Sequence, residues 1–196
     1  MNRPTSAREL LGTVVTRYRA LREYTDTGRV AVPLTTRSTH ETTFTTKLNR
    51  DGDFRFAFAS PHPYPPLRHR ITQYELGRLG GEVYLRSTRP SGQEQVERPG
   101  RWDVGVAMAT GISGGAAHTI ASLLFPEAGT SLLEQLRRPR LRAPQVVCGT
   151  VCFQVRGRHP SGGRITLYIG AHDLLLRRLD EHRLRSCEWR EPRGAR

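Results

Sequence analysis

The sequence lacks charge over one long segment, although charged residues make up 25% of its 196 residues. Between Val104 and Pro126, the segment VGVAMATGISGGAAHTIASLLFP contains no Asp, Glu, Lys or Arg. Such a segment must be buried in protein, in a bilayer or against an apolar ligand. Glycines and hydroxyl-bearing residues interrupt it, so it fits a membrane span poorly. We expect two short helices joined at a hinge formed by Ser113, Gly114 and Gly115; a strand followed by one helix is an alternative.

Lysine is nearly absent. Lys47 is the only lysine among 31 basic residues, which face 18 acidic residues and give a net charge of +13. The excess of Arg, Ala, Gly, Leu and Pro is typical of a GC-rich coding sequence, a hypothesis that the nucleotide sequence tests. The arginines are spread along the chain, whereas a nucleic-acid binder concentrates charge or interleaves it with aromatic residues. We therefore do not favour a nucleic acid as partner, and an anionic membrane surface explains the charge equally well.

Cysteine is also scarce, with Cys148, Cys152 and Cys187 only. The first two lie in VVCGTVCFQV, which predicts a strand, and four strand residues span about 13 Å. A disulfide bridges Cα atoms at most about 7 Å apart, so these two cannot pair unless Gly149 forms a sharp bulge. Cys187 could pair with either of them, and buried free cysteines acting as small apolar residues are the alternative.

Signals for metals, cofactors and secretion are missing. The seven histidines show no H-x-H or H-x₃-H spacing, and the carboxylates form no recurring pair, so we expect no metal, no cofactor and no catalytic dyad. The opening MNRPTSAREL has no apolar core before the first predicted helix. As written, the chain would stay in the cytoplasm, and the sequence leaves its location open.

Local patterns predict an α+β fold. Ser6 followed by Glu9 is a capping box that predicts a helix ending near Leu21. Period-two alternation then predicts strands at 29–32, 42–48, 54–58, 71–76 and 82–85. After the uncharged segment we expect a short helix at 131–136 and strands at 145–156, 164–169 and 174–179. This order predicts one domain over residues 1–181, a curved antiparallel sheet or incomplete β-barrel with an N-terminal helix and an inserted helical lid. Residues 182–196 are expected to form a basic tail.

One motif suggests catalysis. Residues 111–115 read G-I-S-G-G and match G-x-S-x-G, the nucleophile elbow of serine hydrolases. The flanking segments read as hairpins, whereas those enzymes need a largely parallel sheet, and no oxyanion segment precedes Ser113. A serine esterase using Ser113 is therefore kept as an alternative, because Ser-Gly-Gly also suits a hinge between helices.

The order of segments resembles the LolA-type lipoprotein carriers and related periplasmic lipid-binding half-barrels. Four segments carry the resemblance: ARELLGTVVTRYRALREYTDTGRV, FTTKLNRDGDFRFAF, the uncharged segment in the place of the lid helices, and VCGTVCFQVRGRHPSGGRITLYIGAHDLLLRRLDE. It covers about Ser6 to Glu181. The resemblance implies a half-barrel around a cavity for acyl chains and a periplasmic or other extracytoplasmic location. It also implies that Arg50 latches the lid through backbone carbonyls, although Asp51 replaces the proline that follows in the family.

The sequence thus predicts a non-enzymatic protein that binds and transports the acyl chains of lipids or lipoproteins. The residues expected to line the cavity are Phe54, Phe56, Phe58, Ile112, Leu123, Leu124 and Phe125. The alternative is that these residues fill the core and leave no cavity. A regulatory domain that binds another protein on the same scaffold is a further alternative.

Overall fold

The computed structural model describes residues 4–35, 38–62, 64–67, 69–182 and 184–195. The helices are α1 (Ala7–Arg19), α2 (Trp102–Ile112), α3 (Ala116–Leu124) and α4 (Leu132–Gln135), with short 3-10 helices η1 (Pro65–Leu67) and η2 (Pro126–Ala128). The strands are β1 (Glu23–Thr35), β2 (Ser38–Leu48), β3 (Phe54–Pro61), β4 (Ile71–Leu79), β5 (Glu82–Thr88), β6 (Glu94–Glu97), β7 (Arg137–Val147), β8 (Thr150–Arg158), β9 (Arg164–Gly170), β10 (Leu176–Glu181) and β11 (Arg185–Ala195).

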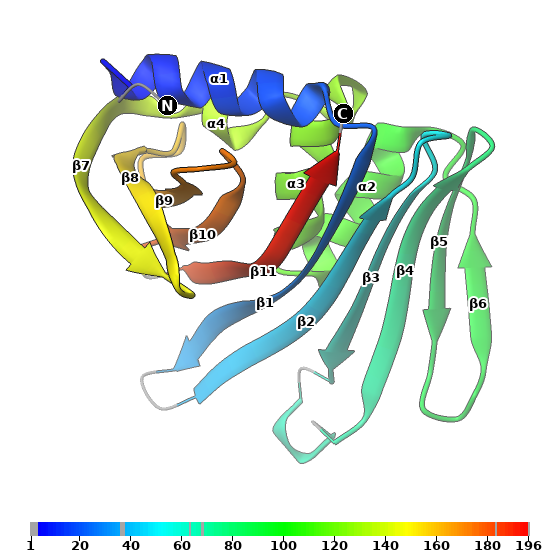
Figure 1. The fold of residues 1–196 in the computed structure, drawn as a ribbon. Helices are drawn as coiled ribbons and strands as arrows, with labels where there is room; N and C mark the ends of the chain where they lie inside the picture. The colour runs from blue at the N-terminus through cyan, green and yellow to red at the C-terminus, as the bar shows by residue number, and fades with distance from the viewer. Residues whose placement is uncertain (1–3, 36–37, 63, 68, 183, 196) are drawn as a thin grey trace.

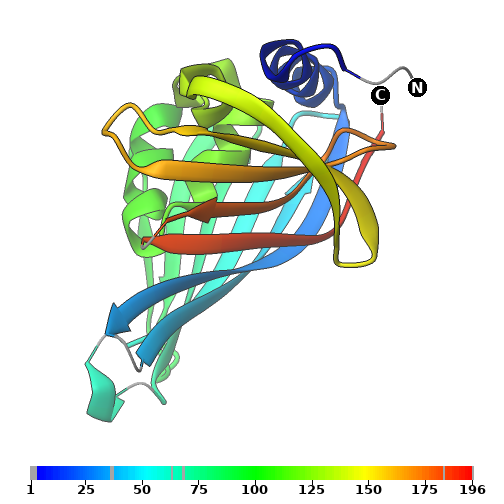
Figure 2. The ribbon, with the colours of Figure 1, turned by 90° about the vertical axis from the view of Figure 1, so that its left-hand side faces the viewer.

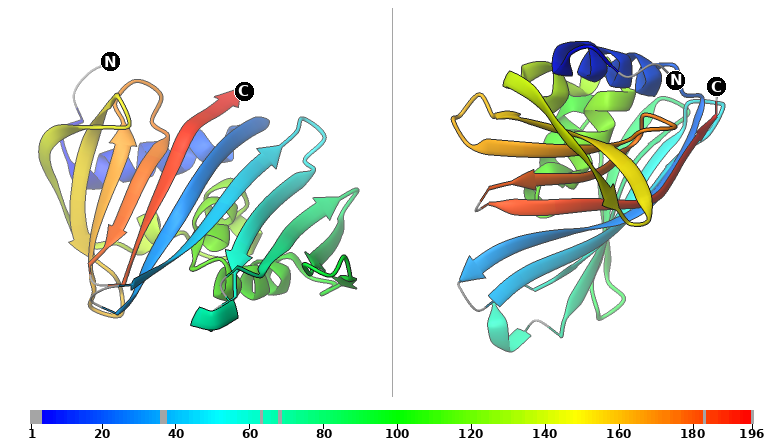
Figure 3. Two further views of the ribbon diagram at one scale, coloured as in Figure 1. Left: turned by 90° about the horizontal axis from the view of Figure 1, so that it is seen from below. Right: turned by 60° about the vertical axis from the view of Figure 1, so that its left-hand side comes forward.

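All the described strands belong to one antiparallel sheet, in the order β6-β5-β4-β3-β2-β1-β11-β10-β9-β8-β7. The sheet is curved and open, with edges at β6 and β7 (Figure 3). Strands β1 to β6 run outward as hairpins to one edge. The chain then passes through the helices to the other edge, and β7 to β11 return until β11 pairs with β1. This is the α+β fold with a curved open sheet that the sequence predicts.

Helix α1 lies across one end of the sheet (Figures 1 and 2). It begins where predicted, because the side chain of Ser6 accepts a hydrogen bond from the backbone N–H of Glu9 at 3.1 Å. The carboxylate of Glu9 bonds to Thr5 instead of completing the box. The buried stripe of the helix ends at Tyr18, whose hydroxyl accepts the N–H of Leu176 on β10 at 3.0 Å.

The uncharged segment forms two helices, α2 and α3, as predicted. They lie against one face of the sheet, called the inner face here, and the opposite face is called the outer face (Figure 1). Gly114 and Gly115 join them with φ values of 61° and 88°, a region that favours glycine. No helix in the described ranges is long and apolar enough to cross a bilayer.

One local prediction about a strand is wrong. The segment expected as one strand at 145–156 is a hairpin, in which Val147 pairs with Thr150 across Cys148 and Gly149. These two turn residues have φ values of 49° and 74°, as a two-residue type I′ turn requires. The hairpin also places the arginine-dense segment 137–142 in the edge strand β7. All three cysteines are free: Cys148 is exposed, whereas Cys152 and Cys187 are buried.

The expected basic tail is also wrong over its described part. Residues 185–195 form β11, which pairs with both β1 and β10 near the middle of the sheet. Cys187 and Trp189 alternate with polar neighbours and are completely buried on the inner face. The many arginines of this segment make its alternation of buried and exposed residues hard to recognise in the sequence. The arginines at 190 and 193 lie on exposed positions of the strand.

Candidate ligand-binding site

A groove of about 450 Å³ lies on the inner face at the end of the sheet farthest from α1. There the ends of β1 to β4 extend beyond the helices, so no helix covers them (Figures 1 and 2). The groove is lined by strand residues and by the C-terminal end of α2 with its hinge: Val32, Leu34, His40, Ser60, Pro61, His62, Thr72, Tyr74, Gly111, Ile112 and Gly114. We call it the inner groove.

Apolar side chains are exposed in the inner groove. Leu34 on β1 is 48% exposed and Ile112 at the end of α2 is 36% exposed, while Val32 and Tyr74 are half-buried beside them. The side chains of Val32 and Leu34 point inward because they continue the alternation that buries Val30. A group of exposed apolar residues in a concave site is typical of ligand or partner binding.

The strand ends also bring polar groups to this groove. The imidazole Nε2 of His40 lies 3.1 Å from the hydroxyl of Ser60 and 3.4 Å from that of Thr42. The Nδ1 of His62 accepts the backbone N–H of Tyr64 at 3.1 Å. An apolar groove with a few polar groups can hold an apolar chain and orient its polar end.

An arginine from the middle of the sheet holds the hinge between α2 and α3. The Nη1 of Arg185 on β11 donates to the carbonyl oxygen of Gly114 at 2.5 Å, and its Nε donates to Glu181 at 3.1 Å. A Cβ on Gly115 would lie 1.4 Å from this Nη1, so only glycine permits the contact. Burial lowers the pKa of His118 on α3, and the nearby positive charge of Arg185 adds to that effect.

The structure packs most of the expected cavity residues into a closed core. Phe54, Phe56 and Phe58 are at most 2% exposed, and the ring of Phe54 contacts those of Trp102 and Phe125 edge-on at 5.3 and 5.5 Å. Leu123 and Leu124 are buried and Phe125 is half-buried. The space expected between these residues is therefore filled by their own side chains. Of the expected cavity residues, Ile112 lines the inner groove.

Arg50 has a different contact from the one that the resemblance implies. Its Nε donates to Oε1 of Glu23 on β1 at 2.7 Å, and its side chain is 73% exposed. The arginine that does bond to a carbonyl of the helical insertion is Arg185. Arg50 therefore contacts Glu23 in this structure, whereas Arg185, 71 residues from Gly114 in the sequence, contacts the hinge.

Ser113 has a structural role in this geometry. It is completely buried, and its Oγ accepts the backbone N–H of Ala117 at 3.2 Å, which helps to begin α3. A substrate could not reach the buried hydroxyl without displacing the helices, so the geometry does not support a nucleophile. Among the described residues, no cluster of three His, Cys, Asp or Glu side chains could hold a metal ion.

A buried carboxyl interrupts the apolar inner face. Asp26 on β1 is 4% exposed, and its Oδ2 accepts the hydroxyl of Tyr24 at 2.6 Å. Its Oδ1 has no hydrogen-bond partner among the described residues. Burial raises the pKa of Asp26 to about 7, although the hydrogen bond from Tyr24 opposes the shift.

Sequence reasoning missed most of the inner groove. A signal for Leu34 was present, because it continues the alternation of Val30 and Val32 past Pro33, but the predicted strand ended at residue 32. No local signal marks Arg185, whose partner Gly114 is 71 residues away in the sequence.

Solved structures share this fold, whereas comparison of the sequence finds no match. No family model and no curated protein matches the chain. A putative outer membrane lipoprotein-sorting protein domain from Vibrio parahaemolyticus is 10% identical over 95% of this chain and 91% of that domain, but its TM-score of 0.33 is too low to support an argument. MucB aligns with a TM-score of 0.52 and 12% identity, over 97% of this chain and 59% of the MucB chain. The Pseudomonas aeruginosa MucA/MucB complex gives a TM-score of 0.51 at 12% identity, over 97% of this chain and 57% of that chain. This chain therefore shares its fold with somewhat more than half of MucB.

Proposed function

We propose that this protein binds an apolar or amphiphilic ligand, such as the acyl chain of a lipid or lipoprotein, in the inner groove. It then carries or presents this ligand without changing it chemically. The observation that carries the proposal is the exposure of Leu34 and Ile112 in a groove that the helices leave uncovered. Each methylene group buried there would contribute about 0.8 kcal/mol.

The dimensions and polarity of the groove support this proposal. Its volume of about 450 Å³ falls within the range of small-molecule sites, which is about 300–1,000 Å³. His40, Ser60 and His62 lie in the same groove and offer hydrogen bonds to a polar head group. The helical insertion would act as the lid, because Gly111 near the end of α2 and Gly114 in the hinge line the groove. A small movement of the hinge would then widen or close it.

The proposal includes a LolA-type carrier scaffold and an extracytoplasmic location, both implied by the sequence resemblance. An anionic membrane surface fits the net charge of +13 as a donor or acceptor of the ligand. Regulatory protein binding on the same scaffold is the second candidate function. The fold shared with MucB favours it, since one MucB structure is a complex with MucA.

Binding of a fluorescent fatty acid tests the primary proposal. We expect 11-(dansylamino)undecanoic acid to gain fluorescence with the native protein, and native mass spectrometry to show the bound mass. A Leu34→Asp variant should bind at least about tenfold more weakly, because it places a charge in the apolar groove.

Val146→Asp is the matched control. Val146 is 69% exposed on the edge strand β7, so this variant replaces an exposed apolar side chain with the same charge outside the groove. It should bind the probe like the native protein. No uptake by the native protein, or an equal loss in both variants, contradicts the proposal.

A further inference from the structure

A second groove runs along the outer face of the sheet, over β1, β2 and β3 beside β11. Three hollows of about 700, 410 and 450 Å³ form it. The first and second share Thr25, Lys47 and Arg55, and the second and third share Thr27 and Thr45. Shared walls make these hollows one continuous path, which we call the outer groove.

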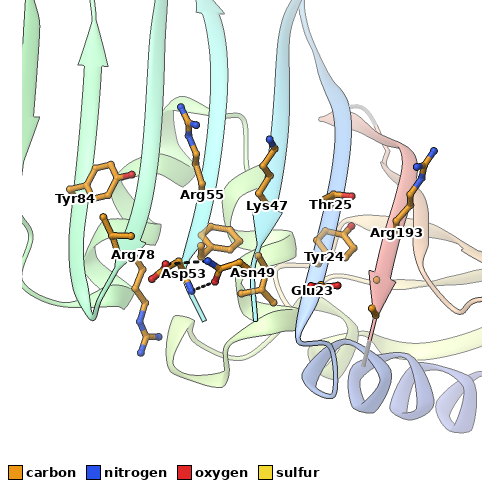
Figure 4. Close-up of a pocket in the computed structure, with 15 residues that line it drawn as sticks. Glu23, Tyr24, Thr25, Lys47, Asn49, Asp53, Arg55, Arg78, Tyr84 and Arg193 are labelled. Carbon is orange, nitrogen blue, oxygen red and sulfur yellow. Dashed lines mark hydrogen bonds between the residues drawn. The ribbon is translucent and has the colours of Figure 1, made fainter. Parts of the chain in front are cut away.

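Positive charges line the outer groove in a row across the strands. The register pairs Arg193 with Thr25, Thr25 with Lys47, and Lys47 with Arg55. The charged ends of these three basic side chains point the same way (Figure 4). Arg190 lies on the next outward position of the groove, opposite Thr27.

The lining also includes the acidic residues Glu23, Asp53, Glu41 and Glu191, so the positive charges of the groove are partly neutralised within the protein. Arg55 forms an ion pair with Glu75, and Arg193 forms one with Glu191 at 3.1 Å between highly exposed side chains. Lys47 and Arg190 have no ion pair within the described ranges. Lys47 and Arg55 lie directly opposite each other on adjacent strands. Like charges in this arrangement destabilise a sheet. A bound anion would relieve this repulsion.

The floor of the groove offers hydrogen-bond donors between the charges. Thr25, Thr27 and Thr45 are exposed, and no side-chain hydrogen bond within the described part of the chain involves their hydroxyls. Hydroxyls and basic groups together suit carboxylates, because charge-assisted hydrogen bonds are stronger than neutral ones.

The shape of the groove favours an extended chain. Its lining on β2 runs from Leu48 to Glu41, which is about 23 Å at about 3.3 Å per residue. At one end it reaches Tyr84 and the 61% exposed side chain of Leu79, which offer apolar contact. A flat bilayer cannot follow a narrow groove, and a single-stranded nucleic acid would need aromatic platforms along its length, whereas Tyr24, Phe54 and Phe44 beneath the floor are buried.

We propose that the outer groove binds an extended acidic polypeptide segment of a partner protein, whose carboxylates contact Lys47, Arg190 and Arg193 and whose backbone lies over the threonines. This site lies on the opposite face from the inner groove and does not depend on a ligand there. The outer groove would be the binding surface for the second candidate function, regulatory protein binding. A negative result at either groove therefore leaves the proposal for the other groove unaffected.

Fluorescence anisotropy with a fluorescein-labelled (Glu-Ala)₆ peptide tests this inference on the full chain. We expect saturable binding that weakens with added salt, as exposed charges require, and no binding of a labelled (Lys-Ala)₆ peptide. The triple variant Lys47→Glu, Arg190→Glu, Arg193→Glu should bind at least about tenfold more weakly. The control Arg137→Glu, Arg140→Glu, Arg142→Glu has the same net charge and changes exposed positions of β7, so it should lose less than about twofold.

A neutral variant separates the groove from general attraction between charges. Thr45→Trp fills the floor and leaves every charge in place, and it should weaken peptide binding by about fivefold or more. Circular dichroism and fatty-acid binding that match those of the native protein would show that the triple variant of the groove and Thr45→Trp are folded. The inference is overturned if the two triple variants lose equally, if Thr45→Trp has no effect, or if the native protein does not bind the peptide. It is also overturned if single-stranded DNA or anionic vesicles compete for the groove more strongly than the peptide.

Discussion

The inner and outer grooves lie on opposite faces of the same strands, and their chemistry is opposite. On β4, Tyr74 faces the inner groove and the adjacent Gln73 lines the outer groove. On β2, His40 lies inside, whereas Thr43 and Thr45 lie outside. Successive side chains of a strand point to opposite faces, so one segment can build two unrelated surfaces.

The two faces differ in what they need from the rest of the chain. The inner face requires the helices, because its aromatic side chains would otherwise be exposed to water. Where α2 and α3 end, that cover ends too, and the inner groove begins. The outer face requires no cover, since threonines and basic residues are stable in water. The inner groove therefore forms where the helices leave apolar side chains exposed, whereas the outer groove is defined by its charged and hydroxyl side chains.

The largest expected effect compares adjacent residues on β3. Phe56 is completely buried on the inner face, and Arg55 is exposed on the outer face. Phe56→Ala should lower the free energy of unfolding by about 3–5 kcal/mol, because it leaves a cavity in the core. Arg55→Ala should change it by less than about 1 kcal/mol, as is typical of an exposed ion pair. Urea denaturation followed by circular dichroism measures both. Similar losses in the two variants would show that the faces do not differ as described.

The next largest effect concerns Asp26, the carboxyl on the inner face. Burial raises its pKa to about 7 in the folded protein, whereas an aspartate in an unfolded chain has a pKa of about 4. Between these values the folded state binds one more proton, so the contribution of Asp26 to stability is largest at low pH and falls as the pH rises. The loss is about 1.4 kcal/mol per pH unit in this window.

Asp26→Asn should remove this contribution to the pH dependence. Relative to the native protein, the variant should gain about 3 kcal/mol in unfolding free energy between pH 5 and pH 8. Denaturation curves at several pH values measure this difference, in which the contributions of other groups cancel. Parallel pH profiles for the two proteins would contradict a raised pKa at this position.

A smaller effect is expected at the hinge. Arg185→Ala removes the hydrogen bond to Gly114 and leaves that carbonyl without its charged donor. We expect a loss of about 1.5–3 kcal/mol and faster amide hydrogen exchange in residues 113–117. The matched control is Arg178→Ala on β10, whose ion pairs lie on the outer face and are more exposed. Unchanged exchange at the hinge in Arg185→Ala would show that this contact does not stabilise the connection between α2 and α3.

The smallest effect is expected for Arg50, which the family resemblance marked as the latch. Its side chain is 73% exposed and pairs with Glu23, which is 42% exposed. Arg50→Ala should therefore change the unfolding free energy by about 0.5 kcal/mol or less and leave hydrogen exchange at the hinge unchanged. A larger effect on the hinge than that of Arg185→Ala would restore the original assignment.

Sequence patterns were sufficient for features that depend on neighbours in the chain. The capping of α1 by Ser6, the common face of Phe54, Phe56 and Phe58, and the hinge at Gly114 all follow from local spacing. The turn at Cys148 was missed because a non-glycine residue there adopts a positive φ, which few sequence signals mark. β11 was missed because its many arginines indicated a basic tail, although its residues alternate between buried and exposed positions.

The sequence by itself determined which side chains share a face of each strand and where the chain must turn, because both depend on backbone geometry over a few residues. Only the tertiary structure decided that the phenylalanines fill a core instead of lining a cavity. It also decided that Leu34 and Ile112 remain exposed together and that Arg185 reaches Gly114. Those outcomes depend on how far the helices extend over the sheet and on contacts between segments far apart in the chain, which local periodicity does not specify.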